Sequence, residues 1–153
     1  MKSKVVTALI LFVIGCLSIL SVSSCSSKKY DVSYLTTSNI IVENNDITLI
    51  TSQTELEAYK IAPRFMEAGT DFVEKLDSYS SDFFESKMLI VINLQEETSS
   101  SKITVEEVDV IDSEVHVILK RKVPTIGADD IKTWSIFIEM DIQEVESVKY
   151  SFQ

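Results

Sequence analysis

The stretch Met88-Leu89-Ile90-Val91-Ile92-Asn93-Leu94 is almost continuously apolar. Successive side chains of a β-strand point to opposite faces of the sheet, so a strand that is apolar at both parities is covered on both sides. Amphipathic strands, by contrast, alternate apolar with polar residues. We therefore predict that this stretch is a central strand with helix and sheet covering its two faces.

Alternating segments follow this central strand. In residues 103–110 the apolar positions change parity at Glu106-Glu107, which predicts a β-bulge that returns all of them to one buried face. Asp112-Ser113-Glu114 then predicts a hairpin turn. The apolar positions on the two sides of the expected bulge are Ile103, Val105, Val108 and Val110. Further strands are expected over residues 115–119, 133–140, which include Trp134, and 148–152.

The region before the central strand combines two short strands with helix signals. Residues 39–42 and 47–50 are apolar runs separated by a polar turn. Ser52-Gln53-Thr54-Glu55 matches a capping box, and Pro63 predicts the end of the helix that it opens. A second, short helix is expected over residues 71–76. Phe83 and Phe84 are expected to anchor a turn that Asp82 caps.

Together these patterns predict an α+β fold, with one main helix packed on a twisted antiparallel β-sheet or partly open barrel. The length suits one domain, expected over residues 39–153.

The start of the chain has the pattern of an export signal. Lys2 and Lys4 precede an apolar run over residues 5–20, and small residues follow before Cys25. Because the apolar run is short for a membrane-spanning helix, we predict a lipoprotein signal peptide over residues 1–24. Residues 25–38 are then expected to be the lipidated cysteine and a flexible tether. The predicted location is the extracytoplasmic face of the cell membrane, with a lipid anchor.

Two cysteines compete for the lipid. Val22-Ser23-Ser24-Cys25 resembles the bacterial lipobox, which implies a diacylglyceryl thioether on Cys25 after cleavage behind Ser24. Cleavage before Cys16 would leave residues 17–22 as an apolar remnant on the mature chain. If Cys25 is modified and Cys16 is removed, the mature chain has no free thiol for a disulfide or for thiolate catalysis.

Charge argues against nucleic acid as a partner. The formal net charge is -10, and the single basic run Lys120-Arg121-Lys122 is too short to offset it against phosphate backbones. This run is typical of a solvated strand end. Because an acidic domain is repelled by anionic membranes, the lipid has to hold it there.

Signatures of catalysis and cofactor binding are weak. His116 is the one histidine, and three glycines do not supply a phosphate-binding loop. Acidic residues are plentiful but match no calcium-loop spacing, and many alternate with apolar positions as on a solvated sheet face. The chain is predicted not to be an enzyme, and no cofactor or metal site is expected. The candidate carboxylates are Glu106, Glu107, Asp109, Asp129, Asp130, Glu139 and Asp141.

The segment Tyr79-Ser80-Ser81-Asp82-Phe83-Phe84-Glu85, with Lys87 and the apolar residues 89–92, resembles small bacterial lipoproteins of the PrcB-like family. The helix start at residues 51–56, the serines at 99–101 and the strand around Trp134 are also similar. The resemblance covers most of the chain from Ile47 onward. It implies an exported accessory subunit of a protease complex, and hence a role in binding another exported protein.

Two functions from different classes follow from the sequence. The first is a non-catalytic, lipid-anchored domain that binds another exported protein, with no nucleic acid as a partner. The alternative is a small hydrolase or metal-binding protein whose carboxylates come together only in the fold.

Overall fold

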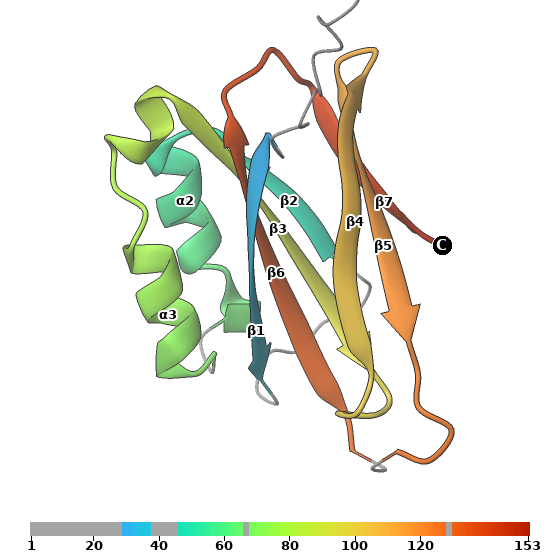
Figure 1. Ribbon diagram of the computed structural model, residues 1–153. Coiled ribbons are helices and arrows are strands. Elements are labelled where there is room, and N and C mark those ends of the chain that lie inside the picture. Colours follow the sequence, from blue (N-terminus) through green and yellow to red (C-terminus); the bar gives the residue numbers. More distant parts are fainter. Residues whose placement is uncertain (1–28, 38–45, 66–67, 128–129) are drawn as a thin grey trace, which may run out of the picture.

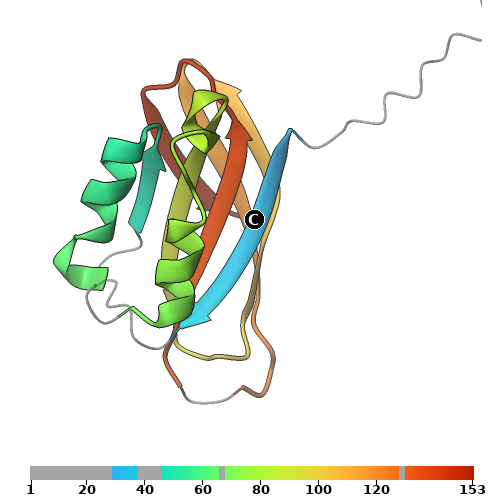
Figure 2. The same ribbon diagram turned by 90° about the vertical axis from the view of Figure 1, so that its left-hand side faces the viewer.

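The computed structural model describes residues 29–37, 46–65, 68–127 and 130–153. The described elements form three layers: two helices, a four-stranded sheet and a three-stranded sheet (Figure 1). Seen from the side, the two helices lie in front of the four-stranded sheet (Figure 2). The α+β character expected from the sequence is confirmed.

The first sheet has the strand order β1-β6-β3-β2, and all its neighbours are antiparallel. Its strands are β1 (Tyr30–Thr37), β2 (Asp46–Ile50), β3 (Lys87–Glu96) and β6 (Lys132–Asp141). The second sheet has the order β4-β5-β7. Its strands are β4 (Lys102–Ile111), β5 (Glu114–Lys122) and β7 (Ser147–Phe152).

Four helical elements are described. The two α-helices, α2 (Gln53–Lys60) and α3 (Thr70–Asp77), have eight residues each. There are also two short 3-10 helices. One, η1 (Pro63–Phe65), follows α2, and the other, η2 (Phe83–Glu85), comes directly before β3. The second helix expected over residues 71–76 is present as α3, with Gly69 at its N-cap. It is as long as α2, so the prediction of one main helix is not confirmed.

The central position of β3 is confirmed. Leu89 and Val91 are buried against the helices, together with Phe137 of β6. The residues of opposite parity pack against the second sheet, so both faces of β3 are covered. The buried residues of β3 on this second face are Met88, Ile90, Ile92 and Leu94.

Asn93, the polar interruption in this run, lies in a hydrogen-bonded cluster beneath the helices. Its side-chain nitrogen donates to Tyr59 Oη at 2.8 Å, and its side-chain oxygen accepts from Ser135 Oγ at 2.7 Å. Asn93 is only 1% exposed, and a buried amide without partners would destabilise the fold. These bonds explain how the core accommodates an amide.

A single antiparallel sheet or partly open barrel is not what the structure shows. The described strands form two sheets and no closed barrel, and β5 pairs with β7 in parallel. The reason is that β6, which follows β5, lies in the first sheet between β1 and β3. The chain returns from there to the second sheet, so β7 runs in the same direction as β5.

The flexible tether predicted over residues 26–38 is wrong for Tyr30–Thr37, which form β1 and pair with β6 along their whole length. Tyr30 and Val32 pack against the core between the sheets, while Leu35 contacts the helix-side core. The Val105 N–H donates to Tyr34 Oη at 3.0 Å, which ties β1 to β4. The folded domain thus includes Tyr30, well before the predicted start at residue 39. The strand expected over residues 39–42 lies outside the described residues.

The capping box forms with a shift of one residue. Ser52 Oγ accepts a hydrogen bond from the Glu55 N–H at 3.3 Å, as predicted. The Glu55 carboxylate instead accepts from Thr51 N–H at 2.7 Å, and this bond lowers the pKa of Glu55. Helix α2 ends at Lys60, before Pro63. Phe84 is buried as expected, but the Asp82 side chain makes no capping hydrogen bond to η2.

The bulge and the hairpin are both confirmed. Pairing between β4 and β5 shifts between Val105 and Glu107, and the four apolar residues predicted to share a face contact the same core. The hairpin turn has Asp112 and Ser113 at φ values of 50° and 63°. Two residues with positive φ match the turn that fits the twist of a β-hairpin.

Candidate functional site

The strand pairing gives the molecule two ends of different character. Tyr30 lies opposite Met140, whereas Thr37 lies opposite Thr133. We call the end with Tyr30 the near end and the end with Thr37 the far end. The near end also carries the β4–β5 hairpin. Glu146 lies in the chain that leaves β6 at this end, and its N–H donates to Ser113 O of the hairpin at 2.8 Å. The loops from β3 to β4 and from β5 to β6 lie at the far end (Figure 1).

The near end is acidic. Its exposed carboxylates come from η2, the β4–β5 hairpin and the chain that joins β6 to β7. Lys87 at this end pairs with Asp31 at 3.7 Å, which offsets little of the negative charge. These exposed carboxylates are Asp82, Glu85, Asp112, Asp141, Glu144 and Glu146.

The two loops of the far end hold each other. The Ser99 N–H donates to Asp130 Oδ1 at 2.9 Å across them, and this bond, helped by Lys132, lowers the pKa of Asp130. Gly127 approaches the other loop so closely that a Cβ there would lie 2.6 Å from Thr98 Oγ1. The two loops of the far end are therefore in contact, and a side chain at residue 127 would displace the Thr98 hydroxyl.

Replacing Gly127 by alanine is expected to lower the free energy of unfolding by about 0.5–1 kcal/mol, because the new methyl group forces Thr98 Oγ1 to move. Chemical unfolding of the two proteins measures the difference. In a Thr98→Ala background the same change should cost clearly less, since the colliding oxygen is gone. Equal costs in the two backgrounds would contradict the close approach.

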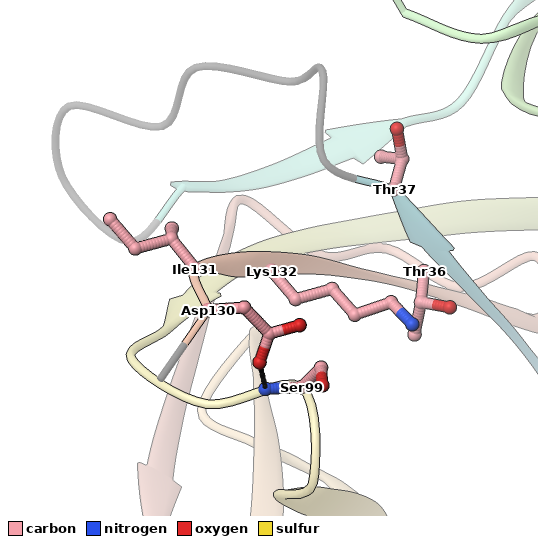
Figure 3. Close-up of a pocket in the computed structure, with 6 residues that line it drawn as sticks. All are labelled: Thr36, Thr37, Ser99, Asp130, Ile131 and Lys132. Atoms are coloured by element: carbon pink, nitrogen blue, oxygen red, sulfur yellow. Dashed lines mark hydrogen bonds between the residues drawn. The ribbon is translucent and has the colours of Figure 1, made fainter. Parts of the chain in front are cut away.

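A polar hollow of about 450 Å³ lies beside these loops. Figure 3 shows Lys132 extending toward Thr36, while Ile131 points away from the other lining residues. Only Asp130 and Lys132 among these residues carry charge, and Asp130 is already bound to Ser99. The hollow is lined by Thr36, Thr37, Ser99, Asp130, Ile131 and Lys132.

Apolar side chains project from the β5–β6 loop into solvent. Ile126 is 91% exposed, Ile131 is 64% exposed and Val123 is 59% exposed. We call these three residues the apolar tip. Single exposed apolar residues are common on protein surfaces, but three within one short loop mark a candidate contact surface.

Basic residues flank the apolar tip. Lys120 and Lys122 are exposed at the end of β5, as the sequence predicts for this run. Arg121 has a structural role, since it pairs with Glu96 at 2.8 Å and lies 4.2 Å from the centre of the Phe152 ring. Within the described residues, Lys120 and Lys122 form no ion pair, so their charges are available to a partner.

The candidate catalytic groups lie apart from one another. His116 pairs with Glu114 at 2.9 Å on β5. Glu139 binds Lys75 at 3.4 Å and accepts from Tyr79 Oη at 2.9 Å, beneath the helices. Burial, and then this hydrogen bond, strongly raise the pKa of Tyr79.

The remaining carboxylates lie at three places. Asp130 is at the far end and Asp141 at the near end, while Glu106, Glu107 and Asp109 are exposed on β4. Among the residues that the structure describes, no three His, Cys, Asp or Glu side chains are grouped to hold a metal ion. Asp129 and the predicted lipidation site Cys25, like Cys16, lie outside the described residues.

The apolar tip was not identified as a candidate site from the sequence. Its signal is three β-branched apolar residues in a segment that also contains Pro124 and Gly127, both typical of loops. Apolar residues at such irregular spacing cannot be separated from a short strand until the pairing is known.

Comparison of the chain with protein-family models, curated proteins and solved structures finds no match. In the described part of the chain, no helix is both long and apolar enough to cross a bilayer.

Proposed function

We propose that this protein is an exported, lipid-anchored, non-catalytic domain that binds another exported protein at the extracytoplasmic face of the cell membrane. The observation that carries the proposal is that the two ends of the domain differ. The chain enters the domain at an acidic near end, and the apolar tip lies at the opposite end. The resemblance to PrcB-like lipoproteins extends the proposal to an accessory subunit of a protease complex.

Anchoring at Cys25 would place one end of the domain near the membrane. Tyr30 follows Cys25 by five positions in the sequence, and five residues span at most roughly 17 Å. The lipid would therefore keep the near end close to the bilayer. Because the near end is the tethered end, the far end is the part of the domain that can lie farthest from the membrane.

The separation of Asp130, Asp141 and Glu139 favours binding over turnover, and Glu106, Glu107 and Asp109 are neighbours on the exposed part of β4. An acid and base pair for hydrolysis needs two carboxyl groups within about 10 Å of each other across a substrate. Asp130 and Asp141 lie at opposite ends of the domain, and Glu139 is held by Lys75 and Tyr79. Anchoring also confines the domain to a thin layer, so a modest affinity can populate a complex with another membrane-bound protein.

The proposal is tested by purifying the full-length chain from membranes in mild detergent. We expect one exported protein to co-purify in a constant ratio, and no hydrolytic activity toward peptide, ester or glycoside substrates. Single substitutions that leave the domain folded should leave the recovery of the co-purifying protein within about twofold. Circular dichroism checks folding, above all for Glu139→Gln, because Glu139 is half-buried and binds Lys75 and Tyr79. A hydrolytic activity abolished by one of these substitutions in a folded protein would instead establish the carboxylate enzyme. The substitutions are His116→Asn, Glu139→Gln and Asp141→Asn.

A further inference from the structure

We infer that the partner protein adds an extended segment rich in lysine or arginine to the outer edge of β1, where it pairs with residues 31–36. The inference rests on the proposed function and deepens it, because it names the surface of this chain and the chemistry of the segment that binds there. A peptide that becomes an additional strand of a sheet gains affinity from main-chain hydrogen bonds and specificity from its alternate side chains.

The outer edge of β1 is open. β1 is the outermost strand of the first sheet, on the side away from β2 (Figure 2). In an edge strand, half of the backbone N–H and C=O groups point away from the sheet. Within the described residues, no backbone hydrogen bond joins β1 to a strand other than β6. None of the eight residues of β1 is fully buried, which agrees with a strand that lacks a neighbour on one side.

The other strand edges are less accessible. At the bulge of β4, the Val105 N–H donates to Tyr34 Oη, and Tyr30 Oη donates to Glu106 O, so tyrosines of β1 occupy backbone groups of β4. On the other side of the two sheets, the short strand β2 lies beside β7. β1 pairs without a bulge and contains no lysine or proline, which are the features that block strand addition.

A hollow beside the edge suits a side chain of an added strand. It has a volume of about 150 Å³ and lies between the far half of β1 and the start of α3. Its lining combines the apolar side chains of Leu35 and Phe72 with the hydroxyl groups of Thr36 and Thr70. A cavity of this volume holds about six carbon atoms. Since an added strand directs every second side chain to the same face, one of them can occupy this hollow.

Charge specifies a basic segment. The elements that flank the edge, β1, α3 and β4, carry seven carboxylates and two lysines. Two of these carboxylates and one lysine form ion pairs within the described residues. Five carboxylates then remain against Lys102, and Lys29 before β1 adds one positive charge. Lys28 and Glu67, which lie outside the described residues, have opposite charges. The five carboxylates are Asp71, Glu74, Glu106, Glu107 and Asp109.

The carboxylates of β4 lie close to β1. The carbonyl oxygen of Glu106 is 3.3 Å from Tyr30 Oη. Burial, and next the charge of Glu107, raises the pKa of Tyr30. A lysine or arginine of the added strand would meet these carboxylates beside the near half of β1, and such complementary charges favour the correct partner.

A second copy of the chain fits this edge less well. Two β1 edges would pair antiparallel about a twofold axis, which places the two near ends at opposite ends of the pair. A strand of eight residues is roughly 27 Å long, whereas Tyr30 lies within roughly 17 Å of Cys25. Both lipids would reach one bilayer only with the strands flat on the membrane. The acidic flanks of the two copies would also repel each other.

The test places a photoreactive benzoylphenylalanine at Thr36, which is exposed on β1, in the full-length, membrane-bound chain in intact cells. The matched position is Ser151, which is exposed on β7. We expect one crosslinked exported protein from residue 36 and a yield about tenfold lower from residue 151. Mass spectrometry of the crosslinked peptide should identify a segment of the partner that contains lysine or arginine.

Charge reversal tests the chemistry of the contact. Glu106→Lys with Glu107→Lys should lower the crosslink yield from residue 36 by about tenfold, because the added lysines repel a basic segment. Glu144→Lys with Glu146→Lys makes the same change of charge in the exposed chain between β6 and β7. This control should leave the yield within about twofold. Circular dichroism of each variant checks folding.

Hydrogen exchange tests strand addition itself. In the complex that co-purifies from membranes, the amides of residues 31–36 should exchange about tenfold more slowly than in the free full-length chain in the same detergent. The reason is that outward N–H groups of β1 become hydrogen-bonded to the added strand. The amides of β7 should exchange at the same rate in both samples.

Several outcomes would overturn the inference. They are equal crosslink yields from residues 36 and 151, a crosslink to a second copy of the chain, a crosslinked segment without lysine or arginine, and unchanged exchange of residues 31–36 in the complex. If an exported protein co-purifies and one of these outcomes is found, the inference fails and the proposed function stands. If no exported protein co-purifies, the proposed function itself fails.

Discussion

The Cys25→Ser chain is expected to lose fatty-acid label completely and to leave the membrane pellet or remain as an uncleaved precursor. Each buried methylene contributes roughly 0.8 kcal/mol to membrane binding, and two acyl chains suffice for stable anchoring. Removing the thiol removes both chains. Growth with radiolabelled palmitate, followed by alkaline washing of the membranes, measures the label and the attachment together.

The matched control is Cys16→Ser, which changes the other cysteine of the chain. This variant should keep the label and the membrane attachment, because residue 16 is predicted to leave with the signal peptide. Label that persists on the Cys25→Ser protein would show that the assignment of the lipid to Cys25 is wrong. Loss of label in both variants would point to a signal region that needs both residues.

The second large effect is expected from Phe137→Ala. Phe137 is 0% exposed in β6, and its ring centre lies 5.8 Å from that of Phe72 in α3. Truncation removes the contacts that join the helices to the first sheet and leaves a cavity, which costs about 3–5 kcal/mol. Since domains are typically stable by about 5–15 kcal/mol, this change should unfold a large fraction of the protein on mild warming.

Urea unfolding of residues 29–153, followed by circular dichroism, measures the loss for Phe137→Ala. Phe152→Ala is the matched aromatic control, because Phe152 is 37% exposed at the end of β7. We expect it to cost about 1–2 kcal/mol, less than Phe137→Ala, because the Phe152 ring is partly exposed and contacts Arg121 and Tyr150. Similar costs for the two variants would contradict the placement of Phe137 at the centre of the core.

The local features of the fold could be predicted because each depends on neighbouring residues. Burial of β3 on both faces follows from apolar residues at both parities, and the bulge follows from the change of parity at Glu106-Glu107. The start of α2 depends on the Ser52 hydroxyl, which accepts a hydrogen bond from the Glu55 N–H three residues later. Each signal is complete within about ten residues of sequence.

The candidate site could be predicted only in part. The sequence indicates that Lys120-Arg121-Lys122 ends a strand, but it does not indicate which acidic residues the fold brings near one another. It does not indicate that Gly127 and Asp130 lie against the β3–β4 loop, which lies more than twenty residues earlier. That contact depends on β3 and β6 pairing in one sheet while β4 and β5 pair in the other.

By itself, the sequence determined the α+β class, the central strand, the bulge and the helix starts, because periodicity and capping act between residues close in the chain. The tertiary structure alone decided that Tyr30–Thr37 form a strand, since their stability comes from pairing with β6 a hundred residues later. It also decided the division into two sheets and the gathering of exposed carboxylates at the near end. These features depend on which distant strands pair, and pairing is selected by burial of the whole core.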